Sequence, residues 1–509
     1  MTSLDIALAA RRLLDDALAT PRIAGLLYGA LVALAAAPAA LWPIPRGNDI
    51  VNHWARLTLY HLAPGDPITG LYRVHFGLIP NLGGDALYLA LCPLLSAQTV
   101  VRIALALSIA LPALGAWAIH RVLFAKPSPT IWLVPFLSYN VATSVGLLNF
   151  AIGMGVAFLG VAYAASRETL RARDLIALNL LGVALFFCHL IALAAFMLIL
   201  GLMLVAPLNA PVAVLARRAG VAALAFVVPL VLVALREADP STYNLSDTAK
   251  VSLLYAPVAS MTASDQAALY LLLAATALAL LRGLEISPRA TLAVAGFAVA
   301  AMISPSAWGA GALIDARLKV YLWYLAIAAT SLRSADGLRP LVALAAIVMT
   351  AARLYGVAPA WAAFQERAAT IREGLAALPP GARALVVSPG DCGDPDVGGY
   401  GSLTVFAVID RRAYVNTLFA QSGIQPVAPA DPVLDGGPTI AMDERWLSDK
   451  ARATLPAHLR NMPWSAAFRD WRKHFTHVID AHAGCASKLD APGLTRIGGA
   501  AGLDVYRID

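Results

Sequence analysis

The sequence predicts a polytopic α-helical membrane protein with about eleven transmembrane helices and a small C-terminal α/β domain outside the membrane. Hydrophobic residues make up 59% of the 509 residues and charged residues only 14%, whereas soluble domains are about a quarter charged. The mean hydropathy of +0.70 agrees. The net charge of +7 comes mostly from Lys and Arg between apolar segments. This position indicates that they set the orientation of the chain in the membrane rather than bind nucleic acid.

A membrane span needs about 20 mainly apolar residues. The sequence offers eleven such segments, and ten to twelve is the expected range because several are short or adjacent. The predicted spans are 23–42, 98–120, 130–145, 147–166, 174–188, 189–206, 219–235, 265–281, 290–305, 318–332 and 340–357. Residues 84–97, interrupted by Pro93, predict a re-entrant or interfacial helix, or the start of the second span.

The distribution of Lys and Arg between the loops predicts the orientation, since cytoplasmic loops carry more of them. With the N-terminus in the cytoplasm, the inner loops hold fourteen of these residues and the outer loops before the tail hold seven. The inner set is Arg11, Arg12, Arg22, Arg121, Lys126, Arg167, Arg171, Arg173, Arg217, Arg218, Arg282, Arg289, Arg333 and Arg339. An odd number of spans then places the C-terminus outside.

The composition predicts two domains. Residues 1–357 form a membrane domain whose first outer loop, 43–84, is long and aromatic. Residues 358–509 form an outer α/β domain, with an amphipathic helix over 358–378 and strands in ALVVS, LTVFAVIDRRAYV, HFTHVIDA and LDVYRID. In an oxidising compartment Cys392 and Cys485 either form a disulfide or remain two thiols.

The stretch PIPRGNDIVNHWAR at the start of the first outer loop holds the main candidate site. A helix there places Asp49, His53 and Arg56 on one face, with Asn48 as its N-cap. Asp49 is a general base or a cation ligand, or else a residue that caps the helix. Arg56 is a contact for a substrate phosphate, or else an arginine that reaches lipid phosphates. His53 is a further substrate-binding candidate, or else a surface histidine in the headgroup region.

A second group of candidates lies at the outer end of a late span. Asp315, Arg317 and Lys319 form either an interfacial ion pair or an anion site that faces the first outer loop. His75, within that loop, is a further candidate for substrate binding.

We interpret other polar residues within the predicted spans as contacts between helices. His189 suits a neutral, hydrogen-bonded imidazole between helices, and Asn149 suits helix–helix contact beside glycines. No phosphate-binding loop, dinucleotide fingerprint, HExxH or GxSxG motif is present in the sequence.

An apolar first span, an outer-loop Asp followed by His and Arg, many spans and a C-terminal outer domain together resemble the GT-C class of integral membrane glycosyltransferases. The resemblance implies a bacterial inner-membrane enzyme that transfers sugar from a polyprenyl-phosphate donor to a glycan, lipid or protein acceptor, with Asp49 as the catalytic residue. Many members have two adjacent acidic residues where this chain has Asn48 and Asp49, so a divalent cation is left open. The alternatives are a transporter or lipid flippase, and a membrane scaffold without catalytic activity.

Overall fold

The chain divides into two compact units in the computed structural model. The structure describes residues 12–236, 251–308, 311–333, 338–389, 399–435, 437, 439–448, 465–483, 485, 489 and 491–509. Unit 1 comprises Met1–Leu41, Arg102–Arg236 and Thr242–Pro359, and unit 2 comprises Trp42–Val101, Glu237–Ser241 and Ala360–Asp509. Most of the first outer loop therefore belongs to the same unit as the C-terminal segment.

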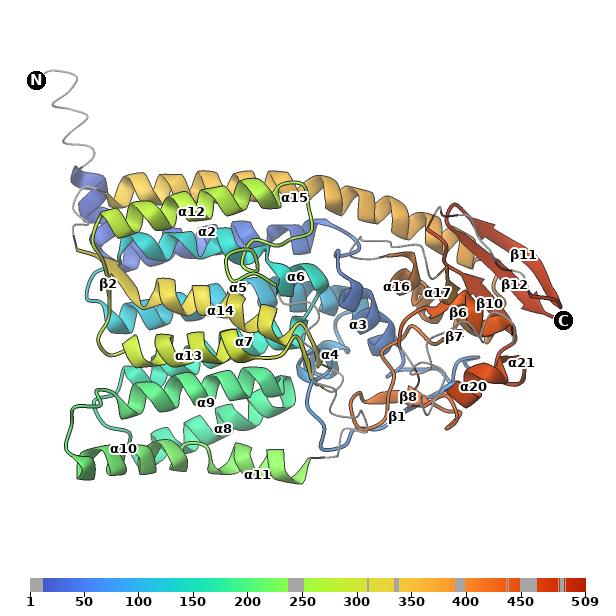
Figure 1. The fold of residues 1–509 in the computed structure, drawn as a ribbon, viewed down its shortest axis with the longest axis horizontal. Helices are drawn as coiled ribbons and strands as arrows, with labels where there is room; N and C mark the ends of the chain where they lie inside the picture. The colour runs from blue at the N-terminus through green and yellow to red at the C-terminus, as the bar shows by residue number, and fades with distance from the viewer. Residues whose placement is uncertain are drawn as a thin grey trace, which may run out of the picture. The chain divides into compact units, whose positions relative to one another are not determined.

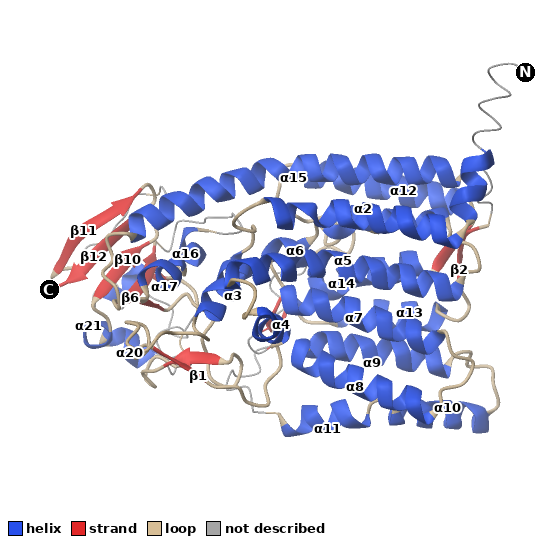
Figure 2. Cartoon of the chain, turned by 180° about the vertical axis from the view of Figure 1, so that it is seen from behind, coloured by secondary structure: helices blue, strands red, loops and turns tan. Residues whose placement is uncertain are grey.

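Unit 1 is a bundle of helices that run roughly parallel to one another (Figures 1 and 2). Two short antiparallel pairs connect helix ends: β2 (Leu284–Ile286) with β5 (Thr330–Leu332), and β3 (Ala307–Trp308) with β4 (Gly311–Ala312). The helices are α2 (Pro21–Leu41), α5 (Ala97–Leu123), α7 (Leu148–Ala165), α8 (Ala172–Cys188), α9 (Leu190–Val205), α10 (Val212–Leu224), α11 (Val227–Leu235), α12 (Asp265–Leu281), α13 (Thr291–Ile303), α14 (Ile314–Ala328) and α15 (Arg339–Leu375). Residues 97–101 of α5 and 360–375 of α15 belong to unit 2.

Eleven transmembrane helices are not supported. Among the described residues, α2, α5, α7 and α15 are long and apolar enough to cross a membrane, and α10 with α11, bent by 52°, makes a fifth if the pair counts as one span. The apolar helices α9, α12 and α13 are shorter, at 16, 17 and 13 residues. At about 1.5 Å per residue they fall short of a hydrocarbon layer about 30 Å thick.

The span predicted at 130–145 is not a continuous helix. Pro135 interrupts the segment, because proline has no backbone N–H to donate to the preceding turn. Asn140 then starts a new helix with a reciprocal capping box to Thr143, and Gly146, with φ of 97°, ends it. The segment consists of η1 (Pro129–Leu133), η2 (Pro135–Ser138) and α6 (Val141–Val145).

The glycines predicted to pack closely in GLLNFAIGMG do so. A Cβ on Gly155 in α7 would lie 2.5 Å from the Cβ of Leu111 in α5, and one on Gly115 in α5 would lie 2.6 Å from the Cβ of Phe158. On the other side of α7, a Cβ on Gly153 would lie 2.8 Å from that of Ala192 in α9. The backbones of α5 and α7 therefore meet at a contact that only glycine permits.

Unit 2 is built on a six-stranded mixed sheet in the order β11-β12-β10-β6-β7, with β9 also paired to β6. The four central residues of β6 are wholly buried, as is typical of a parallel strand covered on both faces. β6 runs parallel to β7, β9 and β10, whereas β12 is antiparallel to β10 and β11 to β12. The strands are β6 (Arg383–Ser388), β7 (Tyr414–Val415), β9 (Met442–Asp443), β10 (His477–Asp480), β11 (Leu494–Ala500) and β12 (Leu503–Ile508).

Short helices and one separate strand pair complete unit 2. α3 contacts both α16 and α17, and β1 pairs with β8 in antiparallel register. At the end of α15, a Cβ on Gly374 would lie 3.1 Å from the Cβ of Ala500 in β11. The elements are α3 (Asn48–Thr58), β1 (Tyr72–Val74), α4 (Gly83–Leu91), α16 (Tyr400–Leu403), α17 (Phe406–Arg411), β8 (Val427–Pro429), η3 (Glu444–Leu447), α20 (Ser465–Arg469) and α21 (Trp471–His474).

Two local predictions in this part of the chain are wrong. The segment LTVFAVIDRRAYV, predicted as a strand, forms the end of α16, then α17, and contributes only Tyr414 and Val415 to the sheet. Its apolar residues Leu403, Phe406 and Val408 also suit a short buried helix. In so short a segment the spacing of apolar residues alone does not distinguish a strand from a helix. The helix predicted at 358–378 is not separate, because it continues the preceding apolar segment within the 37-residue α15.

Cys485 is disulfide-bonded, whereas Cys92 and Cys188 are free, and Cys188 is buried. Cys392, its predicted partner, lies outside the described residues.

We expect the α5–α7 contact to limit stability. Gly155→Ala places a methyl group against the backbone at Leu111, and overpacking of this kind costs about 1–3 kcal/mol. The thermal unfolding temperature of the purified full-length protein should fall. Gly29→Ala in α2 is the matched control because no atom lies within 4 Å of its added Cβ. A lower unfolding temperature for Gly29→Ala but not for Gly155→Ala would contradict the packing argument.

Candidate functional site

Helix α3 carries the residues that the sequence placed at the centre of the site. Gly47, with φ of 150°, precedes the helix, and no side chain caps it, so the predicted capping role of Asn48 is wrong. The eight residues from Ile50 to Leu57 are all buried. Asp49 in the first turn is only half-buried. α3 is therefore a core helix of unit 2, and its N-terminal turn is the part that solvent reaches.

Arg56 lies in a buried cluster that holds α3 against α4. Its guanidinium donates to both carboxylate oxygens of Asp85, with Nε–Oδ1 at 2.9 Å and NH2–Oδ2 at 2.6 Å. It also contacts Nδ1 of His53 at 3.1 Å and donates to the amide oxygen of Gln425. Tyr60 donates to the same carboxylate of Asp85. Arg56 thus already binds an acid, which fits a structural role better than a phosphate contact.

Burial and charge set the protonation states in this cluster. Burial, and then the adjacent guanidinium, lower the pKa of His53 well below its ordinary value, so the imidazole is neutral. Burial alone would lower the pKa of Arg56, but Asp85 and Tyr60 outweigh it and raise that pKa. Burial and the Asp85 carboxylate raise the pKa of Tyr60, which keeps the phenol protonated as a donor.

Several further contacts join the first outer loop to the C-terminal segment within unit 2. The amide N–H of Phe419 donates to Oδ1 of Asn52 at 2.8 Å, and Trp54 packs edge-on against Phe406. Arg73 donates to Asp435 at 2.6 Å from an exposed position. His75, at the exposed end of β1, donates its backbone N–H to the carbonyl of Pro426 at 2.8 Å. The role of His75 in substrate binding stays a prediction.

A polar cavity of about 270 Å³ lies in unit 2 at the carboxyl ends of parallel strands. Ser388 ends β6, Thr417 follows β7, and Ala481 and Ala483 follow β10. In open α/β sheets, ligands bind at this edge. Asn48 of α3 also lines the cavity, so Asp49 directly follows a lining residue. The remaining lining residues are Gly399, Tyr400, Gly401, Ser402, Thr439, Ile440 and Ala441.

The second group of predicted residues lies in unit 1, on α14. Asp315 and Lys319 form a buried ion pair of 2.7 Å one turn apart. Both are also bonded to the backbone of Val251, whose N–H donates to Asp315 at 3.1 Å and whose carbonyl accepts from Lys319 at 2.8 Å. The pair therefore anchors the segment that precedes α12.

Arg317 and His189 interact with each other in the same unit. NH1 of Arg317 lies 3.1 Å from Nε2 of His189, and the guanidinium lies 5.5 Å from the ring centre of Phe150. Nδ1 of His189 accepts from the backbone N–H of Ile191 at 3.2 Å and caps α9. The predicted hydrogen-bonded role of His189 is confirmed. Anion binding by Arg317 and Lys319 stays a prediction.

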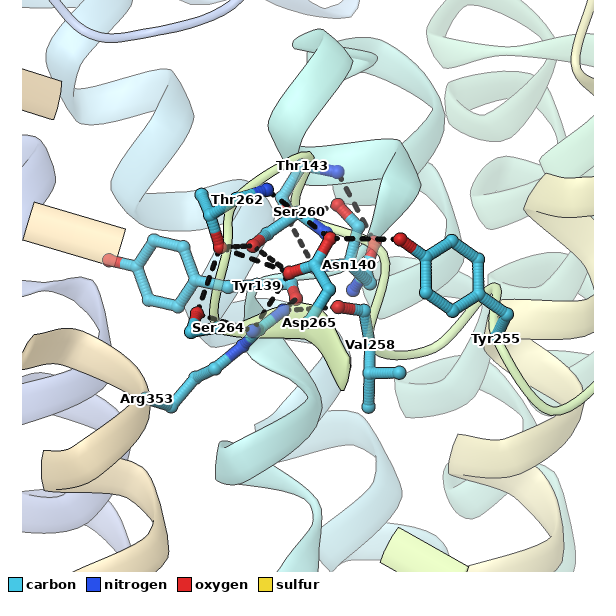
Figure 3. A network of polar contacts seen from close by, with 10 residues as sticks. All are labelled: Tyr139, Asn140, Thr143, Tyr255, Val258, Ser260, Thr262, Ser264, Asp265 and Arg353. Carbon is cyan, nitrogen blue, oxygen red and sulfur yellow. Dashed lines mark hydrogen bonds and ion pairs between the residues drawn. The ribbon is translucent and has the colours of Figure 1, made fainter. Parts of the chain in front are cut away.

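A polar network around Arg353 in unit 1 was not predicted from the sequence (Figure 3). Arg353 of α15 donates to Asp265 at 3.0 Å, to Ser264 at 3.1 Å and to the carbonyl of Tyr139 at 2.8 Å, and it also donates to the carbonyl of Val258. Asp265 in turn accepts from the N–H and hydroxyl groups of neighbouring residues. These donors are Ser260, Thr262 and Tyr255.

Two signals in the sequence could have revealed the missed residues. Arg353 interrupts an apolar segment, and an arginine there normally has a partner. Asp85 follows two glycines just after the first outer loop, one turn before Tyr88. Neither signal identifies the partner, because Arg353 and Asp265 are 88 residues apart.

Comparisons of the chain with family models, with curated proteins and with solved structures find no match. In the part of the chain that the structure describes, no group of three or more His, Cys, Asp or Glu residues could hold a metal ion.

We expect Asp85 to be essential for the stability of unit 2. Asp85→Ala leaves the buried guanidinium of Arg56 without its acid, and breaking a buried pair in this way costs about 3–5 kcal/mol. Denaturant unfolding followed by tryptophan fluorescence should show the loss. Lys473→Ala, which breaks an exposed ion pair with Asp470, is the control and should change little. Equal effects of the two variants would argue against a buried anchor.

The neutral state of His53 predicts a dependence of stability on pH. Below about pH 6.5 the unfolded chain protonates this histidine while the folded protein does not, so the unfolded state binds more protons. Folding should therefore lose up to about 1.4 kcal/mol per pH unit as the pH falls. Unfolding temperatures of the wild type and His53→Asn, measured from pH 7 to pH 5, should converge at low pH. Replacement of the exposed His61 by Asn should not change the slope.

Proposed function

We propose that this protein is a membrane glycosyltransferase in which Asp49 acts as the general base. The observation that carries the proposal is the position of Asp49. It is half-buried in the first turn of α3, directly after Asn48, which lines the polar cavity at the carboxyl ends of the sheet. The rest of α3 is locked in the core, so the carboxylate is presented by a rigid element.

The proposed reaction needs one proton acceptor and a good leaving group. The carboxylate of Asp49 takes the proton from an acceptor hydroxyl as its oxygen attacks the anomeric carbon of the donor. A new C–O bond forms, the bond from the anomeric carbon to the phosphate oxygen breaks, and polyprenyl phosphate leaves with the electron pair. The enzyme therefore contributes mainly positioning and removal of a single proton.

Arg56 and His53 take a different role in this proposal from the one the sequence suggested. Arg56 is bonded to Asp85, and His53 is buried and neutral. Both act as positioning residues that hold α3, and through it Asp49, in place.

The localisation that we propose is the bacterial inner membrane, with the N-terminus in the cytoplasm and unit 2 in the periplasm. Apolar helices long enough to cross a membrane support membrane insertion. The disulfide at Cys485 supports an oxidising compartment for unit 2.

A transporter or flippase is the second candidate. The observation that favours it is Arg353, an arginine buried within the long apolar helix α15. Its bonds to Asp265 and to two loop carbonyls account for it as a structural anchor, however. Transport of a substrate past Arg353 would instead require Arg353 and Asp265 to exchange hydrogen-bond partners.

The decisive variants are at Asp49. Asp49→Asn keeps the shape of the side chain but removes the base, so transfer from a polyprenyl-phosphate sugar in reconstituted membranes should fall by about 10²–10⁴-fold. Asp49→Glu should retain part of the activity, because the carboxylate is only displaced by one methylene group. Expression and unfolding temperature should be unchanged in both.

Asp470→Asn, which changes an exposed acid in the same unit, is the control and should retain wild-type activity. Normal transfer by Asp49→Asn, or transport without transfer in wild-type proteoliposomes, would remove the basis of the glycosyltransferase proposal.

A further inference from the structure

The cavity in unit 2 presents several hydroxyl groups that no other described residue engages. Ser388, Tyr400, Ser402 and Thr439 all line it and are all only partly buried or exposed. Within the part of the chain that the structure describes, their side-chain hydroxyls have no hydrogen-bond partner. Thr417, by contrast, is buried and bonded to Thr404 at 2.8 Å. The four hydroxyls are therefore available to a ligand.

The cavity carries no charged side chain among its described lining residues. Asn48 adds an amide to the hydroxyl groups, and the remaining residues are glycines, alanines and one isoleucine. A phosphate or carboxylate ligand would normally be met by Arg or Lys. Hydroxyl and amide groups instead pair with ligands that both donate and accept hydrogen bonds without a net charge.

One aromatic ring lies in a fixed position at this site. The guanidinium of Arg367 lies 5.7 Å from the ring centre of Tyr400. On the turn between β11 and β12, a Cβ on Gly502 would lie only 2.4 Å from the same ring. The ring is thus held by two neighbours and can provide an apolar surface beside the hydroxyl groups. Gly401 and Ala441 also line the cavity and lie close together, since a Cβ on Gly401 would lie 3.0 Å from that of Ala441.

We infer that this cavity binds a neutral sugar ring, which is the substrate class that the site beside Asp49 receives. The inference rests on the proposed function, since the cavity adjoins the first turn of α3. A sugar ring has an apolar face for an aromatic side chain and hydroxyls at its edge for Ser, Thr and Asn. A volume of about 270 Å³ is at the small end for ligand sites, which run from about 300 Å³ upwards. It suits one ring better than a long chain.

Binding can be tested with the full-length protein in lipid nanodiscs, independently of turnover. The probes are methyl α-glucopyranoside, methyl α-galactopyranoside and methyl α-mannopyranoside, titrated by saturation-transfer-difference NMR. At least one should bind saturably. Ser388→Ala combined with Ser402→Ala removes two hydroxyls, each worth a few-fold in affinity, and should weaken binding about tenfold.

Two controls separate this site from the rest of the surface. Thr495→Ala removes an exposed hydroxyl on β11, far along the sheet order from β6, and should leave the affinity unchanged. Glucose 6-phosphate should bind more weakly than the methyl glycosides. The inference is overturned if no methyl glycoside binds saturably or if the double variant binds as tightly as the wild type. It is also overturned if glucose 6-phosphate or a neutral acetylated tripeptide amide binds in preference.

The same assay distinguishes failure of this inference from failure of the proposed function. Asp49→Asn should bind the methyl glycoside as the wild type does, because the base is not needed for binding. Saturable binding together with normal transfer by Asp49→Asn would reject the catalytic role and keep the sugar site. Loss of transfer in Asp49→Asn without any binding in the cavity would reject the sugar site and keep the catalytic role.

Discussion

The buried ion pair of Arg56 with Asp85 is the constraint on which unit 2 depends. A guanidinium in an apolar core must satisfy several donors at once, since an unpaired buried charge costs several kcal/mol. Arg56 does so with groups from three segments: His53 in its own helix, Asp85 in α4 and Gln425 near β8. These bonds hold α3 in one position, and that position determines where the carboxylate of Asp49 reaches solvent.

Unit 1 uses an arginine in a comparable way. Arg353 joins the carbonyls of Tyr139 and Val258 to the carboxylate of Asp265, and so connects a long helix to two irregular segments (Figure 3). Irregular backbone within a membrane domain needs such partners, because lipid offers none. In both units a planar, multi-donor side chain bonds to several separate segments at once.

The sequence predicted what depends on local pattern. The predicted spans 23–42, 98–120 and 147–166 nearly coincide with α2, α5 and α7. The strands β6, β10 and β12 were predicted from short apolar segments. The helix α3 was also predicted, because Asp49, His53 and Arg56 stand at helical spacing. Long-range pairing was not visible. Nothing local to Arg56 indicates Asp85, and nothing local to Asn48 indicates that residues near Ser388 and Thr417 complete a cavity with it.

The segments that make up unit 2 have a consequence for how the protein is synthesised. Residues 42–101 are made early, but the helices α16 and α17 that contact α3 belong to 360–509, so 253 residues of unit 1 emerge in between. At about 5–20 residues per second, the ribosome needs roughly 10–50 s for that interval. During this time the apolar face of α3 and the unpaired Tyr72–Val74 strand have no C-terminal partner. The nascent chain should therefore rely on a chaperone or on the membrane surface until its last strands are complete.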